Sequence, residues 1–386
     1  MNPRMTRDEL LRRGAAGVTL LSLPGLLAAC GGGDDNGGGE SASGGGGGGE
    51  PNDVLNFSNW ELYIDTKKPT TFQQFKNKTG IKVNYFEDVN SNDGYFAKVQ
   101  GRLRQGQGIG RDIFVATDNS RFPGLYVDQK WVEKLDKSMI PNISNLIPAQ
   151  QHPPFDPNRD YALPWLSGMD GIAWNEDLTD PVTTVDKLFN DPKLKGKVTV
   201  WGEMGDTLGL VMLSNGDDPS NVTDESFDRA IKKVEKARDS GQIRRFTGND
   251  YAQPLARGDL AACFAWSGDV AQLIADNPKL HWGIPETGGI IWTDNMFIPL
   301  GGSVPTASTY MNFVYDPKIA AKIAVETGYI SSVKGVKPFA LKLDPKSGNN
   351  PLVFPDSATL AKVHQNDPKM LSNQDYITKW QKVQGQ

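Results

Sequence analysis

Five short segments of the chain carry tryptophan, tyrosine or carboxylate side chains close together. They span residues 59–63, 203–206, 266–269, 292–294 and 327–329. Aromatic faces attract ammonium groups and stack on methylene stems. Carboxylates neutralise an ammonium group that would otherwise be costly to bury. The combination therefore predicts a binding site for an organic cation, provided that the fold brings the segments together.

Each segment taken alone is weak evidence for a site. A tryptophan near the end of a strand usually belongs to the core or to its rim. Glu203 and Asp206 would lie on one face if this segment were helical, but two acids at a helix start are usually there because the helix dipole favours them. The prediction therefore depends on the recurrence of the pattern.

The elements that must position these segments follow an α/β pattern. Apolar runs predict strands at 54–57, 81–85, 112–116, 260–266 and 295–299. Amphipathic spacing predicts helices around Phe72 and Phe75, with Gly80 as the stop, across 95–104, and through Phe227, Ile231, Val234 and Ala237. Alternating strands and helices predict mostly parallel sheets flanked by helices. Ligands then lie beyond the carboxyl ends of the strands, where the polar turn 117–120 is expected.

The N-terminus has the features of an export signal. Four arginines precede an apolar stretch at 15–29, which is short for a membrane span of about 20 residues. The segment 27–30 resembles a bacterial lipobox, whose cysteine is lipidated. We predict a signal peptide at 1–29, a lipid anchor on Cys30, and a flexible Gly-rich linker over 30–51. Residues 6–12 resemble a twin-arginine signal, but Asp8 replaces the second arginine, so the export route stays open.

Composition narrows the classes of partner and chemistry. The net charge of −5 argues against nucleic acid and weakly favours a cationic ligand. With Cys30 lipidated, Cys263 has no cysteine left to pair with, and its apolar surroundings predict a core position. The three histidines lack metal-ligand spacing, so neither a metal nor a cofactor is expected.

From about Asn52 onward the chain resembles the spermidine/putrescine-binding proteins, the solute receptors of polyamine ABC transporters. The resemblance is carried by residues 58–63, 75–83, 155–164, 288–294 and 326–329, in that order. It implies an α/β, two-lobe, periplasmic-binding-protein-like fold of type II with the ligand cleft between the lobes. The expected division is lobe 1 at 52–168 plus 293–335 and lobe 2 at 169–292 plus 336–386.

The resemblance also implies site roles. Trp60 and Tyr63 match the residues that line the amine stem, and Glu203 and Asp206 match the pair that holds one terminal amine. Asp294 matches the acid that pairs an amine. In the turn after Val115 the family's aromatic is missing. The full set of expected ligand contacts is Trp60, Tyr63, Thr117, Asp118, Asn119, Glu203, Asp206, Trp266, Asp269, Trp292, Asp294 and Tyr329.

The resemblance further implies hinge closure about crossovers near 167–171 and 293–295, read by a transporter permease. A monomer tethered to the membrane by its lipid is expected. Asp170 is interpreted either as a surface hinge residue, which we favour, or as a further acid of the site. The role of Asn119 stays open.

Other functions remain alternatives. The same fold could receive a different organic amine, an amino-acid-like solute or a sugar-like solute. A secreted hydrolase could use paired acids, but the chain has no G-x-S-x-G, H-E-x-x-H or P-loop motif. We therefore predict a receptor and not an enzyme.

Overall fold

The computed structural model describes residues 49–385. The predicted signal peptide, Cys30 and nearly all of the predicted linker lie outside the described residues. Eleven strands are described. They are β1 (Val54–Trp60), β2 (Lys82–Val89), β3 (Ile113–Thr117), β4 (Ala162–Asn175), β5 (Val198–Trp201), β6 (Ile243–Thr247), β7 (Ala262–Trp266), β8 (Leu280–Gly283), β9 (Gly289–Phe297), β10 (Ile330–Ser331) and β11 (Val363–His364).

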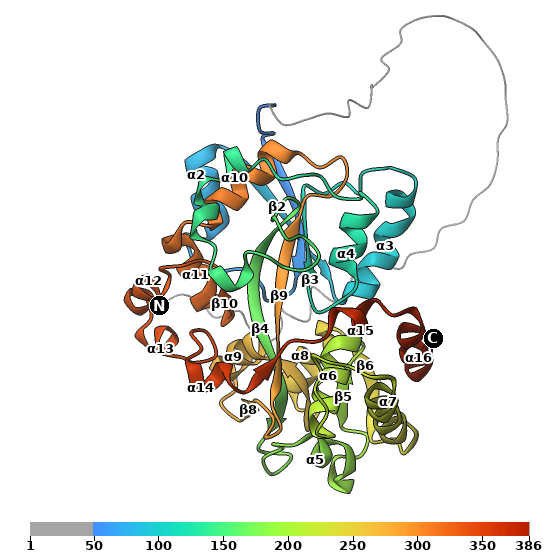
Figure 1. Ribbon diagram of the computed structural model, residues 1–386. Coiled ribbons are helices and arrows are strands. Elements are labelled where there is room, and N and C mark those ends of the chain that lie inside the picture. Colours follow the sequence, from blue (N-terminus) through green and yellow to red (C-terminus); the bar gives the residue numbers. More distant parts are fainter. Residues whose placement is uncertain (1–48, 386) are drawn as a thin grey trace, which may run out of the picture. The chain divides into compact units, whose positions relative to one another are not determined.

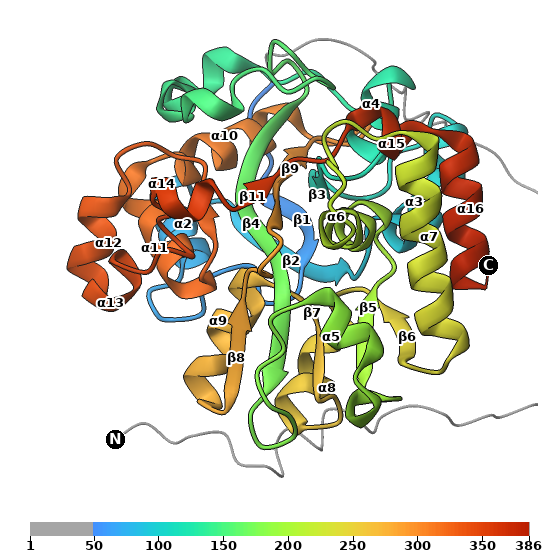
Figure 2. The ribbon, with the colours of Figure 1, turned by 60° about the horizontal axis from the view of Figure 1, so that its bottom comes forward.

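Helices surround these strands (Figures 1 and 2). The longer ones are α2 (Thr71–Thr79), α3 (Asn92–Arg104), α6 (Met204–Ser214), α7 (Asp224–Asp239), α9 (Ser267–Asp276), α10 (Val304–Val314), α11 (Pro317–Thr327) and α16 (Gln374–Gln384). The shorter ones are α4 (Phe122–Asp128), α5 (Val185–Asn190), α8 (Ala252–Arg257), α12 (Lys337–Leu343), α13 (Pro345–Gly348), α14 (Ser357–Leu360) and α15 (Pro368–Ser372), with 3₁₀ turns between some of them.

The strands are paired in the order β2-β1-β3-β9-β4-β7-β5-β6. The outer strands run parallel, as the alternation of strands and helices predicts: β1 with β2 and β3, and β5 with β6 and β7. The two central strands, β4 and β9, run antiparallel to each other and to the strands beside them, β3 and β7. They do so because the chain passes from one group of helices to the other on β4 and returns on β9 (Figure 1).

Strand β4 changes partner in its middle. Its first part, up to Met169, pairs with β9, and its second part, from Asp170, pairs with β7. The change falls within the crossover expected at 167–171. The backbone therefore continues as one 14-residue strand while its neighbours change.

Local signals account for several helix ends. Helix α2 begins with a capping box in which Thr70 accepts from the backbone of Gln73, and it ends at Gly80 in the left-handed conformation. Helix α7 has the same kind of box at Thr223. The predicted apolar face of α7 is buried and includes Phe227, Ile231 and Val234.

Cys263 is fully buried in β7, as its apolar run predicts.

The C-terminal segment joins both groups of helices. Helix α12, which we expected in lobe 2, packs against α11, while α16 packs against α7 at the other end of the sheet (Figures 1 and 2). We therefore propose that α12 belongs with lobe 1 and that the lobe 2 part of the C-terminal segment begins later. The remaining lobe boundaries stay predictions.

Over residues 49–385 no helix combines the length and the apolar character that a membrane span requires. The same residues contain no cluster of three or more histidine, cysteine or acidic side chains arranged to hold a metal ion.

Candidate functional site

Aromatic rings from both halves of the molecule meet where β1, β7 and β9 come together. The last residue of β1, Trp60, packs edge-on against Trp266, the last residue of β7, with ring centroids 5.6 Å apart. Trp292 of β9 lies 6.2 Å from Trp266 and 5.8 Å from Tyr329. Tyr329 in turn lies 4.8 Å from Tyr63. These five rings, which we call the aromatic cage, make edge-to-face and tilted contacts of the kind that aromatic pairs prefer.

Three acids border the cage, and each is held by neutral donors. Asp294 accepts a hydrogen bond from the Thr117 hydroxyl at 2.6 Å. Asp206 accepts from the Asn119 amide at 2.7 Å. Neutral donors orient a carboxylate without supplying a positive charge.

Asp269 has the fullest set of donors. The hydroxyls of Tyr329 and Tyr251 donate to it at 2.6 and 2.8 Å, and the amide of Asn249 donates at 2.7 Å. Asp269 therefore ties the first turn of α9 to Tyr329, two residues beyond the end of α11.

Burial makes the charged forms of these acids costly. Removal from water raises the pKa of Asp269 to about 6 and that of Asp294 to about 7, although their hydrogen bonds oppose the change. Burial also raises the pKa of Asp206 well above its usual value, and Asp170 adds to the rise. Among the described residues, none of these three acids forms an ion pair with lysine, arginine or histidine. A cationic ligand would supply the missing charge.

The cage and the acids enclose one small cavity. Its lining residues are Trp60, Glu61, Tyr63, Thr117, Asp206, Asn249, Trp266, Asp269, Trp292, Asp294 and Tyr329. Nine of the twelve expected contact residues are thus brought together. The cavity volume is about 20 Å³, enough for about one water molecule and far too small for an organic amine. The rings must therefore separate before an organic ligand can enter.

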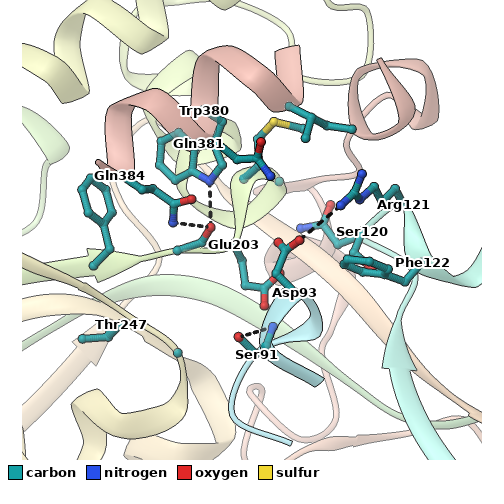
Figure 3. Close-up of a pocket in the computed structure, with 18 of the residues that line it drawn as sticks. Ser91, Asp93, Ser120, Arg121, Phe122, Glu203, Thr247, Trp380, Gln381 and Gln384 are labelled. Atoms are coloured by element: carbon teal, nitrogen blue, oxygen red, sulfur yellow. Dashed lines mark hydrogen bonds and ion pairs between the residues drawn. The ribbon is translucent and has the colours of Figure 1, made fainter. Parts of the chain in front are cut away.

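Glu203 lies in a second, larger cavity of about 360 Å³, shown in Figure 3. It precedes α6 as the N-cap residue with an extended backbone, and Asp206 lies in the first turn of the helix. The condition under which both acids would share one helical face is therefore not met, because Glu203 is the N-cap residue and is not helical. One of its carboxylate oxygens accepts from the backbone N–H of Asn92 at 2.7 Å.

Asn119 contacts residues of both cavities. Its amide donates to Asp206, while its side-chain oxygen accepts from Asn366 at 2.7 Å. Asn366 also donates to the carbonyl of Gly205 at 2.7 Å. Asn119 lines the larger cavity and positions an acid of the smaller one.

Asp118 lines neither cavity. Its carboxylate accepts from the backbone N–H of Thr293 at 2.8 Å, and burial raises its pKa to about 6. Asp118 therefore holds the backbone next to Asp294 and does not face either cavity.

Two sequence expectations about position are wrong. The strand expected at 295–299 is β9, which begins at Gly289 and ends at Phe297, so Trp292 and Asp294 lie inside the strand and not before it. Asp170 was interpreted as a surface hinge residue but is completely buried. Its position in β4, between β9 and β7, places it in the interior.

Sequence reasoning missed several residues of the site. Glu61 lines the cavity and stands next to Trp60 in a segment already singled out, so its type and position could have indicated it. Asn249 and Tyr251 lie in a short 3₁₀ turn after β6 and carry no distinctive pattern. Only the fold brings them to Asp269.

The model of a family described as bacterial extracellular solute-binding proteins matches residues 70–355. The chain belongs to this family. The spermidine/putrescine-binding periplasmic protein of Salmonella typhimurium is 27% identical over 322 residues, which cover 82% of this chain and 87% of that protein. This agrees with the resemblance found in the sequence.

Solved structures of solute-binding proteins share the fold. A putative spermidine/putrescine ABC transporter protein from Listeria monocytogenes is 25% identical, with a TM-score of 0.71 over 86% of this chain and 98% of that chain. The Agrobacterium tumefaciens protein AgtB, solved with agropinic acid, is 18% identical with a TM-score of 0.69 over 86% of this chain and 99% of that chain. The fold is therefore that of the type II periplasmic binding proteins, as predicted.

Proposed function

We propose that this solute-binding protein is the receptor of an ABC transporter and binds a polyamine, spermidine or putrescine, in the cavity of the aromatic cage. One observation carries the proposal. Asp206, Asp269 and Asp294 are buried around five aromatic rings, and none of them has a cationic partner among the described residues. The names of the Salmonella and Listeria relatives support the same ligand class.

The proposed roles follow from the chemistry of the side chains. The rings of Trp60, Trp266 and Trp292 contact the methylene stem and the ammonium groups. The carboxylates pair with the ammonium ends. Because a buried ammonium group without a counter-charge costs several kcal/mol, the spacing of the acids sets the length of the preferred amine.

The proposed site draws residues from both sides of the crossover strands. Trp60, Tyr63 and Asp294 come from one side, and Asp206 and Trp266 from the other. A ligand that contacts both sides favours the closed arrangement, since it can shift an equilibrium only through contacts that differ between the two states. The closed surface is then what the transporter permease recognises.

Calorimetric titration tests the ligand class. Putrescine and spermidine should bind in the micromolar range, whereas a neutral sugar and an acidic solute should not. Each bound amine should be recovered unchanged after long incubation, because a receptor does not convert its ligand. Binding of the sugar or the acidic solute in place of the amines would overturn the proposal.

We also propose export, lipid anchoring through Cys30 and function as a monomer at the outer face of the cytoplasmic membrane or in the periplasm. The lipobox-like segment 27–30 and the periplasmic relatives support this location.

Replacing the lipidated residue tests the anchor. The Cys30→Ala variant should move from the membrane fraction to the soluble fraction of cells, while a Cys263→Ala variant should stay with the membranes because Cys263 is buried in β7. Membrane attachment of the Cys30→Ala variant would refute the proposed anchor.

A further inference from the structure

Asp170 is a buried acid immediately behind the cage. It is the first residue of β4 to pair with β7, opposite Trp266. One of its oxygens accepts a hydrogen bond from the indole nitrogen of Trp292 at 2.7 Å. Its other oxygen is buried and receives no hydrogen bond from any neutral or cationic donor of the described residues. A buried carboxylate oxygen without a donor is costly.

A second carboxyl group lies beside that of Asp170. The side chains of Asp170 and Asp206 lie within hydrogen-bonding range of each other. Ionised carboxylates can only accept hydrogen bonds. The contact is therefore a hydrogen bond only when one of the two acids is protonated, as in other pairs of adjacent carboxyl groups that share a site.

The surroundings favour such a shared proton. The negative charge of Glu203, at the N-cap of α6, raises the pKa of Asp170. The negative charge of Asp294 in β9 raises the pKa of Asp206. A further acid of the site, Asp269 in α9, is hydrogen-bonded only by neutral donors and so brings no positive charge to the pair. Among the described residues no basic side chain bonds to either member of the pair. Burial raises the pKa of Asp170 to about 7 and that of Asp206 well above its usual value.

We propose that Asp170 and Asp206 share one proton beside the aromatic cage and that an ammonium group of the bound polyamine takes the place of this proton. Asp206 lines the cavity, and Asp170 contacts both Asp206 and Trp292 from behind. The amine brings a positive charge, and the displaced proton passes to the solvent. Asp170 is thus a positioning residue that sets the charge of Asp206.

This inference rests on the proposed function and adds a linkage between binding and pH. Below the pH at which the pair loses its proton, each binding event releases about one proton from the pair. The release from this pair alone lowers the affinity about tenfold for each pH unit below this point. Above it, the pair contributes no pH dependence.

The proton count tests the exchange directly. Putrescine and spermidine are titrated at pH 6 in buffers of different ionisation enthalpy, using the parent, Asp170→Asn and, as a control, Asp177→Asn. The asparagine introduced in place of Asp170 can still accept from Trp292 and can donate its amide to Asp206. Asp177 follows the same strand with a side chain 63% exposed. Proton release should fall by about one in Asp170→Asn and stay at the parent value in Asp177→Asn. Equal release from all three proteins would overturn the inference.

A second measurement needs no ligand and separates this inference from the proposed function. The melting temperatures of the three proteins are compared between pH 5 and pH 8. The advantage of Asp170→Asn over the parent should grow as the pH rises, because the parent then loses the shared proton. A difference that does not change with pH would overturn the acid pair. If neither polyamine binds the parent, the proposed function fails, and this comparison still decides whether the pair shares a proton.

Discussion

At the scale of single residues, the three acids of the cage differ in what holds them. Asp294 has one hydroxyl donor, Asp206 one amide, and Asp269 two phenols and an amide. More donors stabilise the charged form better, and the bonds from Tyr329, Tyr251 and Asn249 each lower the pKa of Asp269 against the effect of burial. The acid with fewer donors gains more from a cationic ligand.

Asp294 is therefore the sharpest test of the amine site. The Asp294→Asn substitution keeps the size of the side chain and an acceptor for the Thr117 hydroxyl, but it removes the charge. Affinity for spermidine or putrescine should fall by at least about tenfold, or roughly 1.5 kcal/mol, since one partner of a desolvated pair is lost. Calorimetric titration at pH 8 measures the change. Unaltered affinity would show that Asp294 does not contact the ligand.

At the scale of elements, two glycines allow the rings to approach the backbone. A Cβ atom built on Gly268, in the first turn of α9, would lie 2.3 Å from the ring of Tyr329. One built on Gly168 of β4 would lie 2.4 Å from the ring of Trp292. Real Cβ atoms do not come so close, so the start of α9 and the middle of β4 can carry only glycine while the cage keeps its present form.

A Gly268→Ala substitution should disturb the cage. The new methyl group must displace the ring of Tyr329 and weaken its hydrogen bond to Asp269. Overpacking of this kind lowers the free energy of unfolding by about 1–3 kcal/mol. We expect a lower melting temperature and weaker polyamine binding.

The matched control for this change is Gly101→Ala in α3. A Cβ atom there meets nothing within 4 Å, and alanine should stabilise the helix by about 0.5–1 kcal/mol without altering affinity. If Gly268→Ala behaves like Gly101→Ala in both calorimetry and titration, the close packing of Tyr329 is wrong.

At the scale of the whole molecule, acids accumulate where the two groups of helices meet. Burial raises the pKa of Asp170 and Asp294 to about 7 and that of Glu203 to about 8. Asp118 and Asp269 rise to about 6. Several of these acids therefore keep their protons up to neutral pH, and a bound cation would favour their ionised forms.

This accumulation predicts an unusual pH dependence of stability. Above pH 4 these acids lose their protons in the unfolded chain but keep them in the folded protein until the pH reaches the raised values. The folded state thus binds more protons between about pH 4 and pH 8, so the free energy of unfolding should fall as the pH rises through this range. Scanning calorimetry from pH 5 to pH 8.5 measures the effect. Saturating spermidine should make this fall smaller. A free energy of unfolding that stays constant or rises with pH would contradict the raised pKa values of the buried acids.

How much of this could be predicted depended on whether the signal was local. The strand at 112–116, the α2 cap at Gly80 and the buried face of α7 follow from apolar spacing and cap residues within a few positions, and the structure agrees with them to within a few residues. The length of β4 was not predicted. Its 14 residues change partner halfway, inside the crossover that the resemblance implied at 167–171, but the apolar spacing did not indicate one continuous strand there.

The residue types that form the cage could be identified from the sequence, but their arrangement around one cavity is visible only in the fold. Sequence alone determined that tryptophans and carboxylates recur in a few short segments and that the chain resembles polyamine receptors, and it predicted a cationic ligand. Only the tertiary structure decided that Glu203 and Asp206 face different cavities, that Asp170 is buried against Asp206, and that Asn249 and Tyr251 hold Asp269. The physical reason is the sequence distance over which each kind of interaction acts. Propensity, capping and charge act between neighbours in sequence, whereas the burial and mutual repulsion of carboxylates depend on segments that meet only after the strands are paired.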